Sequence, residues 1–119
     1  MKSRHSVVKS FQFAFEGVWV ALKKGRNFRI QVGFGLVALT VGLVLKLSSY
    51  EFVDLILIIS LVLILELLNT AIESIVDLVS PEIRAEAKVA KDVSAAAVLI
   101  ASIGSILIAA FIFLPKLLG

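Results

Sequence analysis

One segment of the chain, ELLNTAIESIVD, combines apolar residues with four polar side chains spaced for one helix face: Glu66, Asn69, Glu73 and Asp77. We call these four residues the polar stripe. At about 100° per helical residue, their positions fall within an arc of roughly 80°. The residues before them, 55–65, are apolar except for Ser60. Because a carboxylate near the bilayer centre costs about 2.5–3.5 kcal/mol, this alignment on a membrane helix favours chemistry or an ion path over packing.

The polar stripe meets the needs of phosphoryl transfer, in which positioning and charge neutralisation dominate. A carboxylate in a low-dielectric medium can act as a general base. A carboxylate at the wet edge of a membrane can hold Mg²⁺, which prefers oxygen ligands and bridges phosphates. Nearby lysine or arginine can offset polyphosphate charge, and an amide such as that of Asn69 can orient a reacting group. The sequence has no Gly-rich loop followed by Lys-Ser/Thr, so a nucleotide would bind without a P-loop.

Single members of the stripe also have structural interpretations. Glu73 could form an interfacial ion pair with Lys88 or Lys91, and Glu66 could be a protonated packing residue. Asn69 could link two helices by hydrogen bonding. The presence of all four residues on one face weakens these separate explanations.

The composition indicates an all-α integral membrane protein. The chain has 119 residues, 60% of them hydrophobic, where a soluble domain would have about 45–50%. Three stretches, 30–47, 52–79 and 93–114, are long enough to cross a bilayer, which takes about 20 residues. We therefore expect one membrane-embedded domain over 1–119. The absence of cysteine excludes a disulfide framework and a thiol nucleophile.

The basic residues are distributed unevenly about these three spans. With three spans, the N-terminus and the second loop lie on one side of the membrane, which then holds ten of the twelve lysines and arginines. The other side holds only Lys46 and Lys116. The positive-inside rule places the N-terminus in the cytoplasm. The same bias accounts for the net charge of +3 without nucleic-acid binding.

Residues 6–24 predict an amphipathic helix that lies in the headgroup layer. Its apolar residues follow the i, i+3, i+4, i+7 pattern, and Lys9, Gln12, Glu16 and Lys23 occupy the opposite face. An aromatic-rich apolar face with basic flanks is typical of interfacial helices. A core helix in a soluble bundle is the alternative, which the three apolar stretches disfavour.

Short connections should join the spans. Residues 47–51 predict a turn, so the first two spans form a helical hairpin. Ser80 is the expected N-cap of a new helix or loop that begins at Pro81. In the third span Ala97, Ala101 and Ser105 recur at four-residue spacing, which lets helices approach closely in lipid.

Helix rise predicts the depth of each member of the stripe. If the second span enters the membrane near Phe52, Glu66 lies about 21 Å down and Glu73 about 32 Å. Glu73 would then lie near the inner edge of a hydrocarbon core about 30 Å thick. The cytoplasmic end of the third span brings Lys88, Lys91 and Asp92 to the same level. Since one small chain cannot shield several buried polar groups, we expect a homo-oligomer with sites between subunits.

These motifs resemble the prokaryotic diacylglycerol kinase family, which includes undecaprenol kinases of similar size. The resemblance rests on ELLNTAIE at 66–73, on Asp77, and on AKVAKD at 87–92 followed by AAAV at 95–98. It covers nearly the whole chain, and the paired ExxNTAIE and AKxAKD motifs are highly specific. The segment SPEIRAEAKVAKD is closer to the undecaprenol kinase branch.

The resemblance implies a homotrimeric lipid kinase of the bacterial inner membrane that uses ATP and Mg²⁺, with active sites shared between subunits. Glu66 would be the general base on the lipid hydroxyl, Asn69 would organise the centre, and Glu73 would bind the metal. The residues implied in ATP binding are Glu73, Glu82, Arg84, Lys91 and Asp92. Phe28 and Arg29, in RNFRIQ, match the family's lipid-facing entry to the first span.

Two positions depart from the family pattern. Gly25 stands where the family commonly has a second metal-binding glutamate, and Ser6 stands where an arginine near ATP is often found, with Arg4 and Lys9 close by. The first departure implies weaker metal binding, replacement by a carboxylate such as Glu16, or a less active member. The alternatives to a kinase are therefore a non-catalytic membrane scaffold and, from the paired carboxylates, a small ion-coupled transporter. Three spans without a repeat disfavour the transporter.

Overall fold

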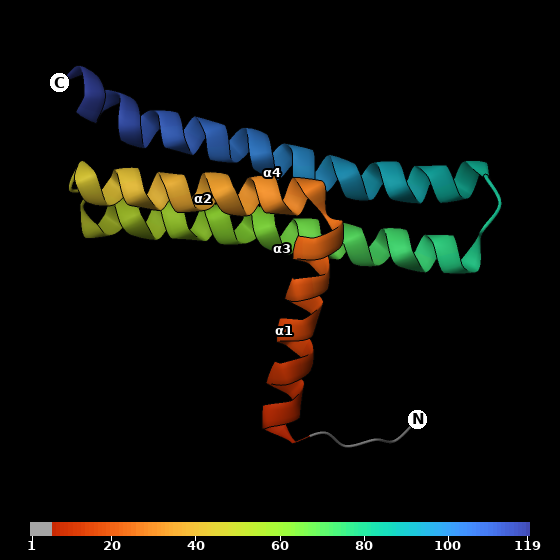
Figure 1. Cartoon of the computed structure of the whole chain (residues 1–119). Helices are drawn as coiled ribbons and strands as arrows, with labels where there is room; N and C mark the ends of the chain where they lie inside the picture. Colours follow the sequence, from red (N-terminus) through yellow and green to blue (C-terminus); the bar gives the residue numbers. More distant parts are fainter. Residues whose placement is uncertain (1–5) are drawn as a thin grey trace.

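The computed structural model describes residues 6–119, and four helices account for most of them. They are α1 (Val7–Lys24), α2 (Arg26–Val44), α3 (Ser49–Val79) and α4 (Ala85–Leu118). Figure 1 shows α2, α3 and α4 alongside one another, with α1 projecting sideways from them. The all-helical prediction is confirmed for the described residues. Lys2 and Arg4, which entered the charge comparison, lie outside them.

The three predicted spans correspond to α2, α3 and α4, which are 19, 31 and 34 residues long and apolar enough to cross a membrane. All three helices begin before the predicted starts at positions 30, 52 and 93. Hydropathy detects the apolar stretch and misses the polar turns that continue a helix beyond it. Helix α2, the first predicted span, ends at Val44 and not at 47, because Lys46 takes a left-handed conformation with φ 57°.

A single residue, Gly25, separates α1 from α2. The side chain of Ser6 caps the start of α1 by accepting a hydrogen bond from the Lys9 N–H at 3.2 Å. At the other end, the Gly25 N–H donates to the Ala21 carbonyl at 2.7 Å. The chain therefore turns sharply from α1 into α2 with no loop between them.

The α2–α3 turn and the last turns of α4 meet at what we call the hairpin end of the molecule. Ser48 and Glu51 form a capping box at the start of α3. The Glu51 carboxylate also pairs with the Lys116 ammonium of α4 at 3.2 Å. Beneath this pair lies a small core of Leu47, Leu55 and Ile112. The hairpin end is thus held together by a cap on α3, an ion pair from α3 to α4 and apolar packing.

The α3–α4 connection differs from the prediction. Ser80 ends α3 and does not cap a helix at Pro81, because its hydroxyl donates to the Glu82 carbonyl at 3.1 Å within the turn. Pro81, Glu82 and Ile83 lie outside any helix, and α4 begins after Arg84. We call this region, with the α3 and α4 turns beside it down to Glu66 and Ser94, the loop end.

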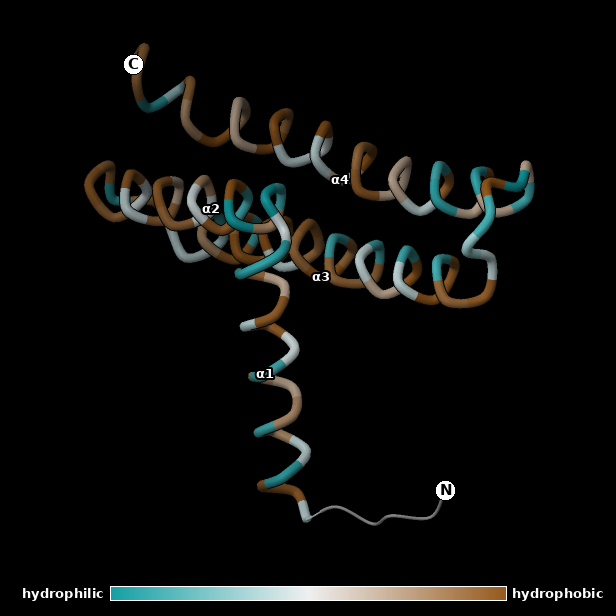
Figure 2. The backbone as a smooth tube through the Cα atoms, turned by 45° about the vertical axis from the view of Figure 1, so that its right-hand side comes forward, coloured by the Kyte–Doolittle hydropathy of each residue, from teal (hydrophilic) through white to brown (hydrophobic). Residues whose placement is uncertain are grey.

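Helix α3 is the centre of the bundle and contacts α4 more extensively than α2. At Gly35 of α2, an added Cβ would lie 3.0 Å from Cγ2 of Ile59, so glycine permits this close approach of α2 and α3. Large apolar side chains on all four helices remain exposed. Figure 2 shows apolar residues along the bundle and hydrophilic ones concentrated towards the α3–α4 connection. Such exposed apolar faces are typical of surfaces that meet lipid or other subunits.

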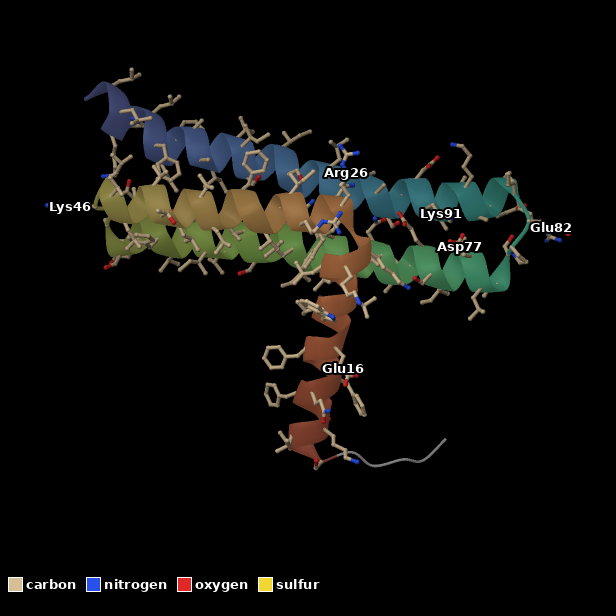
Figure 3. All side chains as sticks on the ribbon, in the orientation of Figure 1. Glu16, Arg26, Lys46, Asp77, Glu82 and Lys91 are labelled. Atoms are coloured by element: carbon tan, nitrogen blue, oxygen red, sulfur yellow. The ribbon has the colours of Figure 1, made fainter. Side chains whose placement is uncertain are left out.

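The level at which α1 leaves the bundle divides α3 and α4 into two parts. In Figures 1 and 3 the α3–α4 connection extends beyond the corner near Arg26, on the opposite side from Lys46. Asp77, Glu82 and Lys91 all lie in this extension. The fold therefore carries the predicted site residues of α3 and α4 to one end of the molecule.

Candidate active site

The polar stripe runs along α3 towards the loop end, and its first two members are buried. Glu66 and Asn69 are only 6% and 9% exposed, although both lie in a long apolar helix. Glu73 is half-buried and Asp77 is exposed. Burial therefore decreases along the stripe in the order that helix rise predicts.

A chain of hydrogen bonds links α4 to the middle of the stripe. The Ser94 hydroxyl of α4 donates to Oδ1 of Asn69 at 2.5 Å, and Nδ2 of Asn69 donates to Oε1 of Glu73 at 3.1 Å. Ser94 is itself buried, with 8% of its surface exposed. The Asn69 amide is thus held at both ends, and the second oxygen of Glu73 is left for another partner.

Two further ion pairs lie near the start of α4. Lys91 pairs with Asp77 across the two helices, while Lys88 pairs with Asp92 along α4 at 2.6 Å. The alternative ion pair of Glu73 with Lys88 or Lys91 is therefore not the one formed, although Lys91 lies close enough to Glu73 to interact electrostatically. Of the predicted ATP-site pair, Lys91 faces the stripe, whereas the Asp92 carboxylate lies on an exposed face.

The Glu66 carboxyl group interacts with the Gln31 side chain of α2. Gln31 also has a buried Oε1 atom without a hydrogen-bond partner in the described chain. A groove of about 350 Å³ opens beside Gln31 and continues along apolar residues of α2, α3 and α4. Gln31 therefore connects buried Glu66 to a groove between the three long apolar helices.

Glu82 and Arg84 lie away from the stripe, in the α3–α4 connection. They help to line a hollow of about 630 Å³ between the last turn of α3 and the first turns of α4. Both side chains are exposed. Figure 3 shows Glu82 at the tip of the molecule, beyond Asp77 and Lys91.

Phe28 and Arg29 lie at the α1–α2 corner. Phe28 is 3% exposed, and the Arg29 guanidinium donates to the carbonyls of Leu22 and Lys23 at 2.8 and 3.0 Å. These contacts close the C-terminal turn of α1. Glu16, the suggested substitute for a glutamate at Gly25, lies out along α1, away from Asp77 and Lys91 of the same chain (Figure 3).

Two residues of this site, Ser94 and Gln31, were not predicted as functional from the sequence. Each carried a weak signal. Gln31 is among the few polar residues of the first span, and Ser94 lies three residues after Lys91 on the same helix face. Neither signal identifies the partner, because the contact depends on how α2 and α4 are aligned along α3.

The family described as prokaryotic diacylglycerol kinase matches residues 12–113. The chain belongs to this family. A diacylglycerol kinase of Synechocystis sp. is 42% identical over 115 residues, which are 96% of this chain and 66% of that protein. An undecaprenol kinase of Bacillus subtilis is 40% identical over 109 residues, which are 92% of this chain and 89% of that protein. Family membership confirms the resemblance inferred from the ExxNTAIE and AKxAKD motifs. Together with the names of these relatives, it supports lipid kinase activity on diacylglycerol or undecaprenol.

Proposed function

We propose that this chain transfers the γ-phosphoryl group of ATP to the hydroxyl of a membrane lipid alcohol, diacylglycerol or undecaprenol. The proposal is carried by one observation. Within a kinase family, a buried carboxylate, Glu66, lies on the same helix face as the Asn69–Glu73 hydrogen bond and the Lys91–Asp77 ion pair. The lipid hydroxyl in the membrane and the phosphates of ATP from the aqueous side would thus meet along the polar stripe.

Glu66 is proposed as the general base. The lipid alcohol would enter laterally from the bilayer, and Glu66 would take the hydroxyl proton as the oxygen attacks the γ-phosphorus of ATP. The bond from the γ-phosphorus to the bridging oxygen breaks, and ADP leaves. The apolar groove next to Gln31 offers a lining suited to an acyl or prenyl chain.

Glu73 is proposed as the Mg²⁺ ligand. Mg²⁺ keeps several waters and often takes one or two protein carboxylates together with phosphate oxygens. The free oxygen of Glu73 fits that need, although the described residues contain no group of three acidic, histidine or cysteine ligands. When bound, Mg²⁺ would neutralise charge on the phosphates.

The ATP phosphates would lie towards the loop end. Lys91 would offset their charge, exchanging part of its interaction with Asp77 for the phosphates. Glu82 and Arg84 border the hollow at the α3–α4 connection, where the rest of the nucleotide would fit. Asp92 would take part in ATP binding after its carboxylate separates from Lys88. Alternatively, it would take part in the ATP site of a neighbouring subunit. A homotrimer with shared sites would also supply groups that one chain lacks.

The chain would lie in the bacterial inner membrane with its N-terminus in the cytoplasm. The sideways course of α1 supports a helix in the headgroup layer, because α2, α3 and α4 would then cross the membrane (Figure 1). Phe28 and Arg29 would lie where that layer meets the first span, so lipid contact there would come in addition to their packing at the corner.

The test uses labelled ATP, Mg²⁺ and either diacylglycerol or undecaprenol in detergent micelles. We expect label in one of the two lipids, and its identity selects the acceptor. Glu66→Gln keeps the shape of the side chain, so it should abolish turnover while the protein remains folded and oligomeric. Wild-type turnover in Glu66→Gln would disprove the base assignment. If neither lipid is labelled and Mg²⁺-ATP gives no thermal shift, the non-catalytic scaffold is the better interpretation.

A further inference from the structure

We propose that Ser94 is a positioning residue, which holds the Asn69 amide in place so that its NH₂ group stays hydrogen-bonded to Glu73. No motif that identified the family includes Ser94. The inference concerns the cation-binding side of the site and rests on the proposed function for the reaction and for Glu73 as the cation ligand.

The orientation of the Asn69 amide follows from its two partners. An ionised carboxylate can only accept hydrogen bonds, so the amide group 3.1 Å from Glu73 must be the NH₂. The amide oxygen then points at α4, where the Ser94 hydroxyl lies 2.5 Å away. Ser94 must therefore donate, which sets the direction of the whole chain of hydrogen bonds.

The Ser94 hydroxyl has a second acceptor within reach, the Lys91 carbonyl of its own helix at 3.0 Å. A serine hydroxyl carries one proton, and the shorter contact to Asn69 takes it. Without this hydroxyl, the Asn69 oxygen would be buried without a donor, which costs about 1–3 kcal/mol and removes the contact that holds the amide against α4. The Asn69 side chain could then leave this position, and its hydrogen bond to Glu73 would weaken.

Ser94 should therefore act on Glu73 through Asn69. When the NH₂ group occupies one oxygen of Glu73, the other oxygen is held in place for a cation. Direct hydrogen-bond partners of a metal ligand typically change metal affinity by about 10–100-fold when removed, and Ser94 lies one hydrogen bond further from Glu73, so its effect should be at the low end of that range. The expected defect lies in the cation requirement more than in the turnover at saturating cation.

The decisive pair of variants is Ser94→Val and Ser94→Thr. Threonine keeps the hydroxyl, and valine has nearly the same shape without it. Ser94→Val should raise the half-saturating Mg²⁺ concentration of lipid phosphorylation by about 10-fold, with a smaller change in turnover at saturation. Ser94→Thr should restore the wild-type Mg²⁺ dependence. Thr40→Val is the matched control, because it removes a hydroxyl that donates within its own helix, to the Leu36 carbonyl at 2.8 Å.

A binding measurement separates this inference from the kinase proposal. Electron paramagnetic resonance titration of Mn²⁺ with a non-hydrolysable ATP analogue should show weaker Mn²⁺ binding in Ser94→Val than in Ser94→Thr. This readout decides the role of Ser94 even if wild-type protein labels neither lipid, which would overturn the proposed function alone. Equal Mn²⁺ binding in the two variants would overturn the positioning role. If Ser94→Val fails to fold, Ser94→Ala gives the same comparison without added bulk.

Discussion

The two ends of the bundle use polar residues in opposite ways. At the hairpin end, one oxygen of the Glu51 carboxylate accepts from both the Ser48 N–H and the Lys116 ammonium, in a structural contact above an apolar core. At the loop end, the Ser94–Asn69–Glu73 chain begins with two buried side chains and stops at a carboxylate whose second oxygen has no hydrogen-bond partner among the described residues. One end uses its polar groups to close a helix terminus, and the other buries them between two helices.

This difference indicates which end contributes to stability and which to catalysis. Polar groups that cap a helix terminus and form an ion pair there hold the helices together. A buried acid and a directed amide in an apolar helix are costly, so their retention favours a functional role. We therefore expect mutations at the hairpin end to change stability, and mutations at the loop end to change turnover.

After the loss expected for Glu66→Gln, the largest effect should come from Asn69→Asp at the loop end. The new carboxylate cannot donate to Glu73 and repels it, although Ser94 can still donate to the substituted side chain. We expect lipid phosphorylation to fall by about 10²–10³-fold, the range seen when one oriented donor is lost from an active site. Turnover per folded protein in micelles measures the effect.

Glu51→Gln is the matched control for Asn69→Asp, because it alters an acidic side chain of the same helix at the opposite end. It should leave turnover at the wild-type level. A comparable loss of turnover in Glu51→Gln would break the division between the two ends.

The next effect should come from Leu55→Ala at the hairpin end. Leu55 is 2% exposed and belongs to the core with Leu47 and Ile112. Truncation should leave a cavity and cost about 2–5 kcal/mol of stability. The thermal midpoint in micelles should fall, while turnover below that midpoint should remain near wild type. Loss of turnover with an unchanged midpoint would mean that the hairpin end takes part in catalysis.

The sequence predicts which residues gather at the loop end better than it predicts the contacts between them. Helical spacing alone places Glu66, Asn69 and Glu73 on one face, because that periodicity is a property of a single helix. The pairing of Lys91 with Asp77, and not with Glu73, could not be predicted in the same way. Pairing across two helices depends on their relative offset, and a shift of one turn changes which carboxylate a lysine meets.

Ser94 and Ser80 illustrate the same limit. Ser94 meets Asn69 from 25 positions away in the chain, so no local rule connects them. Ser80 followed by Pro81 satisfies the local signals for a helix start, yet α4 begins only after Arg84. Local propensity permits both arrangements of the turn. The packing of α3 on α4 selects between them, and this packing is absent from a single-helix argument.

The smallest of these effects concerns Gly25, at the corner that joins α1 to the bundle between the two ends. A Cβ at Gly25 would lie 2.7 Å from the Ala21 carbonyl oxygen, which is backbone and cannot move aside cheaply. Gly25→Ala should therefore cost about 1–3 kcal/mol, as overpacking does. Gly17→Ala is the control within α1. A Cβ there meets nothing within 4 Å, so helix propensity should stabilise it by about 0.5–1 kcal/mol.

Gly25→Glu then tests whether the corner or the missing carboxylate matters more. If the corner geometry dominates, this variant should lose thermal stability as Gly25→Ala does, without a lower Mg²⁺ requirement, because the backbone contact forces the new side chain and the corner apart. If Gly25→Glu instead lowers the half-saturating Mg²⁺ concentration at wild-type stability, the corner yields and the glutamate completes the cation site. That result would extend the cation site of the loop end to the α1–α2 corner. The corner would then belong to the functional region and not only to the structural one.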